Sequence, residues 1–158
     1  MRPPRSWTCT GLFLARLVLA AVFLSAGVIK LWQPPEAFAD SIASFRLLPA
    51  ALVHLLAMLL PPLEILVGGA LLLGKPGSTG ALGAAVLSTG FLVALSVALM
   101  QGITVECGCF GAGQAWFGLN PRQQMWFDLG RDVLLVAMSA LLYCFTPSRL
   151  KAQPVQGE

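Results

Sequence analysis

The sequence reads GLFLARLVLAAVFLSAGVIKL across residues 11–31, and its only charges are Arg16 and Lys30. An apolar run of about 20 residues is long enough, as an α-helix, to cross the hydrocarbon core of a membrane. Three further runs of similar length lie at residues 50–73, 81–103 and 125–145. Spanning helices satisfy their own backbone hydrogen bonds in lipid. The sequence therefore predicts an all-α protein, an integral membrane bundle of four transmembrane helices.

The overall composition agrees with a membrane location. Of 158 residues, 57% are hydrophobic and only 11% are charged, whereas soluble domains carry about 25% charged residues. The net charge of +3 is spread over loops and ends without a basic block, which excludes a nucleic-acid-binding protein. The length fits one compact unit, which we place at residues 11–146, with tails at residues 1–10 and 147–158.

The orientation follows from Lys and Arg in the short loops, which favour the cytoplasmic side. With the N-terminus inside, the inner face holds five such residues: Arg2, Arg5, Lys75, Arg149 and Lys151. The outer face holds three: Lys30, Arg46 and Arg122. We therefore expect both tails in the cytoplasm and the loop after residue 103 in the periplasm or exterior. An alternative is that the first run is a cleaved signal peptide, since Ser25-Ala26-Gly27 resembles a cleavage site.

The connection at residues 32–49 is long enough for structure of its own. Phe38, Ile42 and Phe45 recur at helical spacing, which indicates either a helix lying on the membrane surface or an ordinary loop helix. Small residues in the second and third runs predict close helix packing. They are Gly80, Ala84 and Ser88 on one line, and also Gly68, Gly69 and Gly74.

Four cysteines fall into two groups. In the predicted topology Cys9 and Cys144 lie at the inner ends of the first and fourth runs, where they are most simply small apolar side chains. Cys107 and Cys109 lie a membrane thickness away, too far to pair with the inner two. They occur in the motif Glu106-Cys107-Gly108-Cys109-Phe110-Gly111.

Three interpretations of Cys107 and Cys109 remain open. A disulfide between them closes a very short loop and contributes only about 1.5 kcal/mol by the chain-entropy model, and a strained ring is easily reduced. That favours a redox-exchange site. Two thiolates also suit Cu(I) or Zn, although His54 is the only histidine. The thiols can also be purely structural.

Charged side chains inside the apolar runs need partners. Glu64 follows Pro61-Pro62, which we expect to kink its helix, and residue counting pairs Glu64 with Arg16. Nearer the outer face, we expect Lys30 to reach a second group on the fourth run: Asp128, Arg131 and Asp132. This network either activates the cysteines, because a nearby cation stabilises a thiolate, or only holds the helices together.

The sequence resembles a known family in several segments. Residues 23–31 (FLSAGVIKL) and 45–49 (FRLLP) are similar to the opening of DoxX-like four-helix membrane proteins. Pro62-Leu63-Glu64, the Cys107-Gly108-Cys109 motif and Arg131-Asp132 resemble the MauE branch, which functions in methylamine utilisation. The resemblance covers nearly the whole chain, from residue 14 to residue 145.

This resemblance implies a bacterial inner-membrane protein that supports maturation of the disulfide-rich small subunit of methylamine dehydrogenase. It also implies a separate thioredoxin-like (MauD-like) partner in the periplasm, because this chain has no C-x-x-C motif of its own. No cofactor is evident, and a quinone is possible but not readable from the sequence. The alternative function is a non-enzymatic scaffold or small transporter subunit with structural cysteines.

Overall fold

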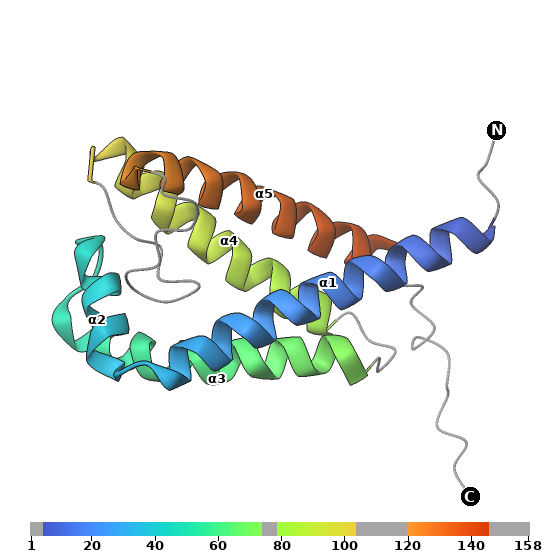
Figure 1. Ribbon diagram of the computed structural model, residues 1–158, viewed down its shortest axis with the longest axis horizontal. Coiled ribbons are helices and arrows are strands. Elements are labelled where there is room, and N and C mark those ends of the chain that lie inside the picture. The colour runs from blue at the N-terminus through green and yellow to red at the C-terminus, as the bar shows by residue number, and fades with distance from the viewer. Residues whose placement is uncertain (1–4, 74–78, 104–119, 146–158) are drawn as a thin grey trace, which may run out of the picture.

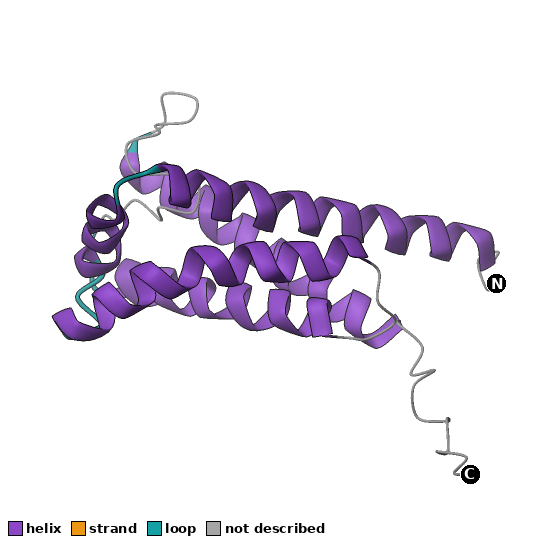
Figure 2. Cartoon of the chain, turned by 90° about the horizontal axis from the view of Figure 1, so that it is seen from below, coloured by secondary structure: helices purple, strands orange, loops and turns teal. Residues whose placement is uncertain are grey.

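The computed structural model describes residues 5–73, 79–103 and 120–145. Within these residues the regular structure is entirely α-helical, which confirms the all-α class (Figures 1 and 2). Four long helices run along the molecule, and one short helix, α2, lies across one end. The elements are α1 (Arg5–Trp32), α2 (Pro35–Ser44), α3 (Ala50–Leu73), α4 (Thr79–Met100) and α5 (Pro121–Phe145).

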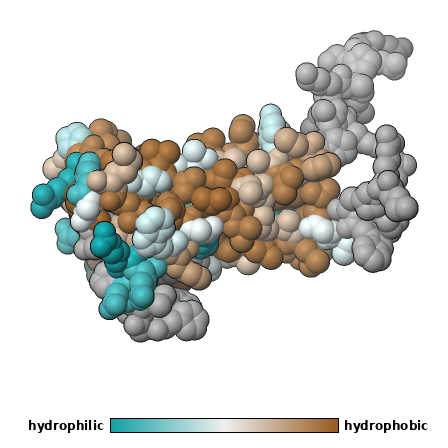
Figure 3. Space-filling model, turned by 90° about the horizontal axis from the view of Figure 1, so that it is seen from above, coloured by the Kyte–Doolittle hydropathy of each residue, from teal (hydrophilic) through white to brown (hydrophobic). Residues whose placement is uncertain are grey.

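Three of the long helices, α1, α3 and α4, are long and apolar enough to cross a membrane. The bounds of α3 match the predicted run, whereas α1 begins at Arg5, earlier than the apolar run itself. In Figure 3, hydrophobic residues dominate the length of the described bundle, and hydrophilic residues gather at one end. The helix α5 has 25 residues but opens with charged side chains. Its crossing of the membrane stays a prediction.

The helices pack as two pairs, α1 on α3 and α4 on α5. Close approach of α1 and α3 depends on Gly27 and Gly68. A Cβ atom at Gly27 would lie 2.9 Å from the carbonyl oxygen of Pro61, and one at Gly68 would lie 3.0 Å from the backbone nitrogen of Leu24. Glycine therefore lets the two backbones meet directly. Gly69, which we also expected at a contact, faces open space.

The short helix α2 belongs to the bundle. It begins with Pro35 at its first position, where a missing N–H costs nothing. Phe38 and Ala39 are buried in a cluster with Val53 and Ala57 of α3. The polar residues of α2 at positions 36 and 40 are exposed. The structure therefore favours the loop-helix interpretation, because the apolar face of α2 packs on protein.

The helix α3 continues through Pro61-Pro62 without interruption, although each proline removes one backbone donor. An apolar cluster from α1, α3, α4 and α5 fills the half of the bundle away from α2. A second cluster, built on Leu95, Ala98 and Met125, lies where α4 ends and α5 begins.

Candidate functional site

The cysteine motif, Cys107-Gly108-Cys109, lies outside the described residues. The described residues that flank it are Ile103, after α4, and Asn120, before α5. Both lie at the end of the bundle that α2 covers (Figure 1). The start of α1, at Arg5, and the end of α5, at Phe145, both lie at the opposite end of the bundle. The motif is therefore connected to the α2 end of the bundle.

A buried ion pair joins α1 to α3 just inside that end. The ammonium of Lys30 donates to Oε1 of Glu64 at 2.5 Å, and the two side chains are 0% and 2% exposed. The same ammonium lies 4.8 Å from the ring centre of Phe38 and 4.9 Å from that of Phe91. Aromatic faces attract cations. Lys30 is thus enclosed by one carboxylate and two rings.

The prediction that Glu64 pairs with Arg16 is wrong. The guanidinium of Arg16 donates instead to the carbonyl oxygens of Leu71 and Leu72, the latter at 3.3 Å. These carbonyls lie in the last turn of α3, where backbone acceptors lack helical partners. Residue counting failed because the contacts at Gly27 and Gly68 fix the register of α1 on α3. That register sets Lys30, not Arg16, level with Glu64.

A second ionic group lies within α5. Arg131 donates to Oδ1 of Asp128 at 2.9 Å and to Oδ1 of Asp132 at 2.9 Å and 3.2 Å. The three residues that the sequence groups on the fourth run are therefore bonded to one another. Asp132 is 1% exposed and Asp128 is 8% exposed. Two carboxylates of α5 therefore share the same guanidinium in the interior of the bundle.

The prediction that Lys30 bonds to the acidic residues of α5 is wrong, because its ammonium bonds to Glu64 instead. The two ionic groups nevertheless border one small cavity, whose lining includes Glu64, Ser88, Arg131 and Asp132. We call these four residues, with Lys30 and Asp128, the polar core. For Lys30 the structure favours the helix-locking interpretation, since its side chain is fully buried and already bonded.

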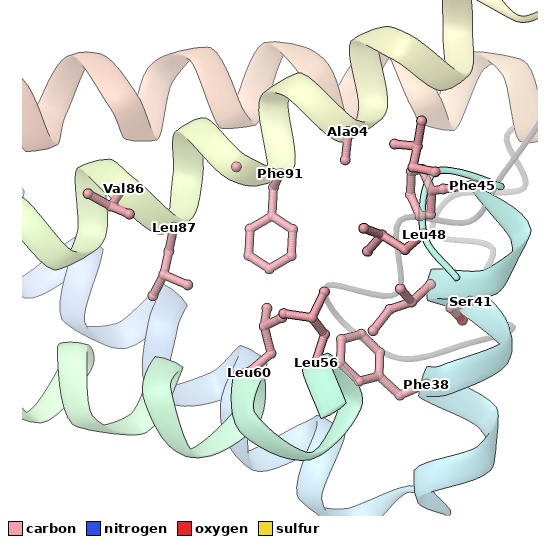
Figure 4. Close-up of a pocket in the computed structure, with 13 residues that line it drawn as sticks. Phe38, Ser41, Phe45, Leu48, Leu56, Leu60, Val86, Leu87, Phe91 and Ala94 are labelled. Carbon is pink, nitrogen blue, oxygen red and sulfur yellow. The ribbon is translucent and has the colours of Figure 1, made fainter. Parts of the chain in front are cut away.

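A larger, apolar pocket lies next to the polar core, between α2, α3 and α4 (Figure 4). We call it the α2 pocket. It has a volume of about 280 Å³. Phe38 and Phe91 separate it from Lys30, because both rings line the pocket and both contact the ammonium. Ser41 is the one polar side chain among the described residues that line it, and its hydroxyl donates to the carbonyl of Ala37.

Sequence reasoning missed three members of this arrangement. The small-residue line predicts only a packing role for Ser88, and no sequence pattern links Phe38 and Phe91 to Lys30. A signal was present for Ser88. On each long helix the buried positions recur at steps of three and four, and Lys30, Glu64, Ser88 and Asp132 all occupy such positions. Cys144 of the predicted inner pair is exposed and free.

Fold and site together define a class: an all-α membrane protein whose buried core contains ion pairs and whose cysteine motif joins its last two helices. Comparison with known proteins gives the family. The model of the family described as methylamine utilisation protein MauE matches residues 8–145. The chain belongs to this family. Its wider relation to DoxX-like proteins stays a prediction.

Two relatives illustrate the similarity. The methylamine utilization protein MauE of Paracoccus denitrificans is 28% identical over 92% of this chain and 75% of its own length. The protein of the same description from Paracoccus versutus is 34% identical over 78% of this chain and 63% of its own length. No solved structure matches. The chain thus spans only part of each relative.

Proposed function

We propose that this chain is an inner-membrane thiol–disulfide exchange component that supports maturation of a periplasmic, disulfide-containing protein. Family membership supports a context of methylamine utilisation. The observation that carries the redox role is the Cys107-Gly108-Cys109 motif in the connection from α4 to α5. Its chemistry suits exchange, because a ring closed by so few residues adds little stability and is easily reduced.

The proposed topology has four spans, with α5 as the fourth, and cytoplasmic termini. The length of α5 supports this. So do Trp32, at the end of α1, and Trp126, near the start of α5, which are both exposed, because tryptophan gathers at membrane interfaces. Asp128 and Asp132 of α5 are buried in the bundle and share Arg131, which removes the main objection to a membrane location. The cysteine motif is then periplasmic.

The exchange itself moves two electrons and two protons. A thiolate of the partner attacks one sulfur of the Cys107–Cys109 disulfide, and the other sulfur leaves as a thiolate and takes up a proton. The second thiol of the partner loses its proton, attacks the mixed disulfide, and releases the remaining cysteine. The partner becomes a disulfide and the pair becomes a dithiol. The reverse sequence passes reducing equivalents outward. We propose a thioredoxin-like, MauD-like protein as the partner.

Repeated turnover in the oxidising direction needs an electron acceptor, and we propose a membrane quinone in the α2 pocket. A quinone bound there would supply the acceptor for the two electrons and two protons that the dithiol of Cys107 and Cys109 gives up when it becomes a disulfide. The pocket supports this with its apolar lining, which includes Phe38, Phe45 and Phe91, and with its volume of about 280 Å³. That volume is close to the lower end of ligand pockets, roughly 300 Å³. It also lies at the end of the bundle to which the cysteine motif is connected.

Filling the pocket tests the quinone. Gly90 lines the pocket, and a Cβ there meets nothing within 4 Å. We expect Gly90→Leu to slow oxidation of the cysteine pair by added quinone several-fold, without unfolding the protein. The matched control is Gly69→Leu, because Gly69 also faces open space but lies outside this pocket. Equal rates in the two variants would refute quinone binding in the α2 pocket.

Trapping the mixed disulfide tests the exchange. In Cys107→Ser or Cys109→Ser the resolving thiol is missing, so the remaining cysteine should stay bonded to its partner. We expect one of the two variants to accumulate a reductant-sensitive adduct in membranes, and the double variant to form none. The alternative function, a scaffold held together by the polar core, predicts no adduct in either single variant and full activity of the double variant.

A further inference from the structure

Each of the four long helices directs at least one polar side chain into the middle of the bundle. Lys30 comes from α1, Glu64 from α3, Ser88 from α4 and Asp132 from α5, and each is 3% exposed or less. A buried polar group without a hydrogen bond is costly, so such groups are normally paired. Each of these four side chains therefore needs a hydrogen-bond partner.

Three oxygen atoms in this group have no partner among the described residues. They are Oε2 of Glu64, Oγ of Ser88 and Oδ2 of Asp132. All three residues line the same cavity. The hydroxyl of Ser88 differs in this from those of two other serines in the long helices, Ser96 and Ser139, which donate to carbonyl oxygens one turn earlier. The three residues that carry these unpartnered oxygens therefore lie around one cavity.

The cavity is the size of a single water molecule. The cavity has a volume of about 20 Å³, and one water needs roughly 10–15 Å³. A water with two to four polar partners is stable in such a cavity. The two carboxylate oxygens only accept, so the hydroxyl of Ser88 is the one donor among these three unpartnered groups.

The polar core also holds more negative than positive charge among its described residues. In the described part of the polar core, two cations, Lys30 and Arg131, face three carboxylates, on Glu64, Asp128 and Asp132. Glu64 is paired with Lys30, and Asp128 and Asp132 share Arg131, so one negative charge in this group has no cation of its own. The residue of α4 that faces them is Ser88, which is uncharged.

We propose that the polar core is a binding site for one proton. The proton is held on Oδ2 of Asp132 as a carboxylic acid and is donated to the cavity, where a single water links it to Ser88 and Glu64. This arrangement adds a second protein donor beside the Ser88 hydroxyl and removes the excess negative charge. A metal cation is disfavoured by the ammonium of Lys30 and the guanidinium of Arg131. The proposal is independent of the cysteine motif.

Infrared spectroscopy of the purified protein in lipid measures the proton directly, because a carboxylic acid has a C=O band that a carboxylate lacks. We expect one such band at neutral pH that is insensitive to sodium and is lost in Asp132→Asn. Asp40→Asn, on the exposed face of α2, should keep it. Absence of the band in the unaltered protein, or its persistence in folded Asp132→Asn, would overturn the proposal, as would its loss on addition of sodium.

A milder pair of variants decides the matter even if Asp132→Asn fails to fold. Ser88→Ala removes the hydroxyl that lines the cavity, whereas Ser139→Ala removes an equally buried hydroxyl bonded within its own helix. We expect the acid band to shift in Ser88→Ala and to stay in place in Ser139→Ala. Bands at the same position in both variants would mean that the proton is not held at this cavity, and the proposal would be wrong.

Discussion

Lys30 carries its charge into a part of the bundle from which solvent is excluded. Its side chain is fully buried, and its ammonium contacts Glu64, Phe38 and Phe91. The sequence alone predicted that Lys30, Glu64 and Arg16 need partners, because a charge at this depth costs about 2.5–3.5 kcal/mol on insertion scales. It could not assign the partners, because they depend on how α1 and α3 are shifted along each other.

Removing one member of this pair should be more damaging than removing both. We expect Lys30→Met to lower the free energy of unfolding by about 3–5 kcal/mol, because it leaves a buried carboxylate unpaired. Lys30→Met combined with Glu64→Met should recover most of that loss. Denaturant unfolding in mild detergent measures both values, with Glu36→Gln on the exposed surface of α2 as control. A double variant as unstable as the sum of the single variants would contradict the pairing.

At the scale of elements, register is set by glycines rather than by charge. Gly27 and Gly68 let the backbones of α1 and α3 meet, and this contact brings Lys30 to Glu64 and Arg16 to the end of α3. The helix positions could be predicted from hydropathy, since the run at residues 50–73 reappears unchanged as α3. The register could not, because Gly68 and its neighbour Gly69 look alike in sequence.

Substitution of Gly68 and substitution of Gly69 should have clearly different effects on stability. We expect Gly68→Ala to destabilise the protein by about 1–3 kcal/mol, as overpacking does, because the new Cβ would meet the backbone of α1 at 3.0 Å. Gly69→Ala should be neutral or slightly stabilising, because it meets no atom within 4 Å and alanine favours a helix. Thermal unfolding in detergent compares them. Equal effects would contradict the close contact of α1 and α3.

The helix α5 illustrates how a buried stripe can carry charge. Its buried residues are Met125, Asp128, Asp132, Leu135, Ser139 and Leu142, at alternating steps of three and four. This is the spacing of a helix face that packs on neighbours. The sequence placed Asp128 and Asp132 four residues apart, a spacing that puts both on one face of a helix. That this face is the interior one became apparent only with the packing of α4 on α5.

At the scale of the whole molecule, apolar helices surround a polar core, and the cysteine motif is connected at the end that α2 covers. The composition was sufficient to predict a membrane protein of the all-α class. The cavity at Ser88 and the α2 pocket were not predictable, because each is built from three or more helices that are distant in sequence. The proposed exchange function requires that Cys107 and Cys109 open to the periplasm as a reversible disulfide.

Thiol labelling of intact cells with a membrane-impermeant reagent tests this requirement most directly, using a variant in which Cys9 and Cys144 are replaced by serine. We predict little labelling of Cys107 and Cys109 before treatment with an impermeant reductant and full labelling of both after it. Both cysteines labelled at once without reductant, or neither labelled until the membrane is permeabilised, would contradict a periplasmic exchange pair.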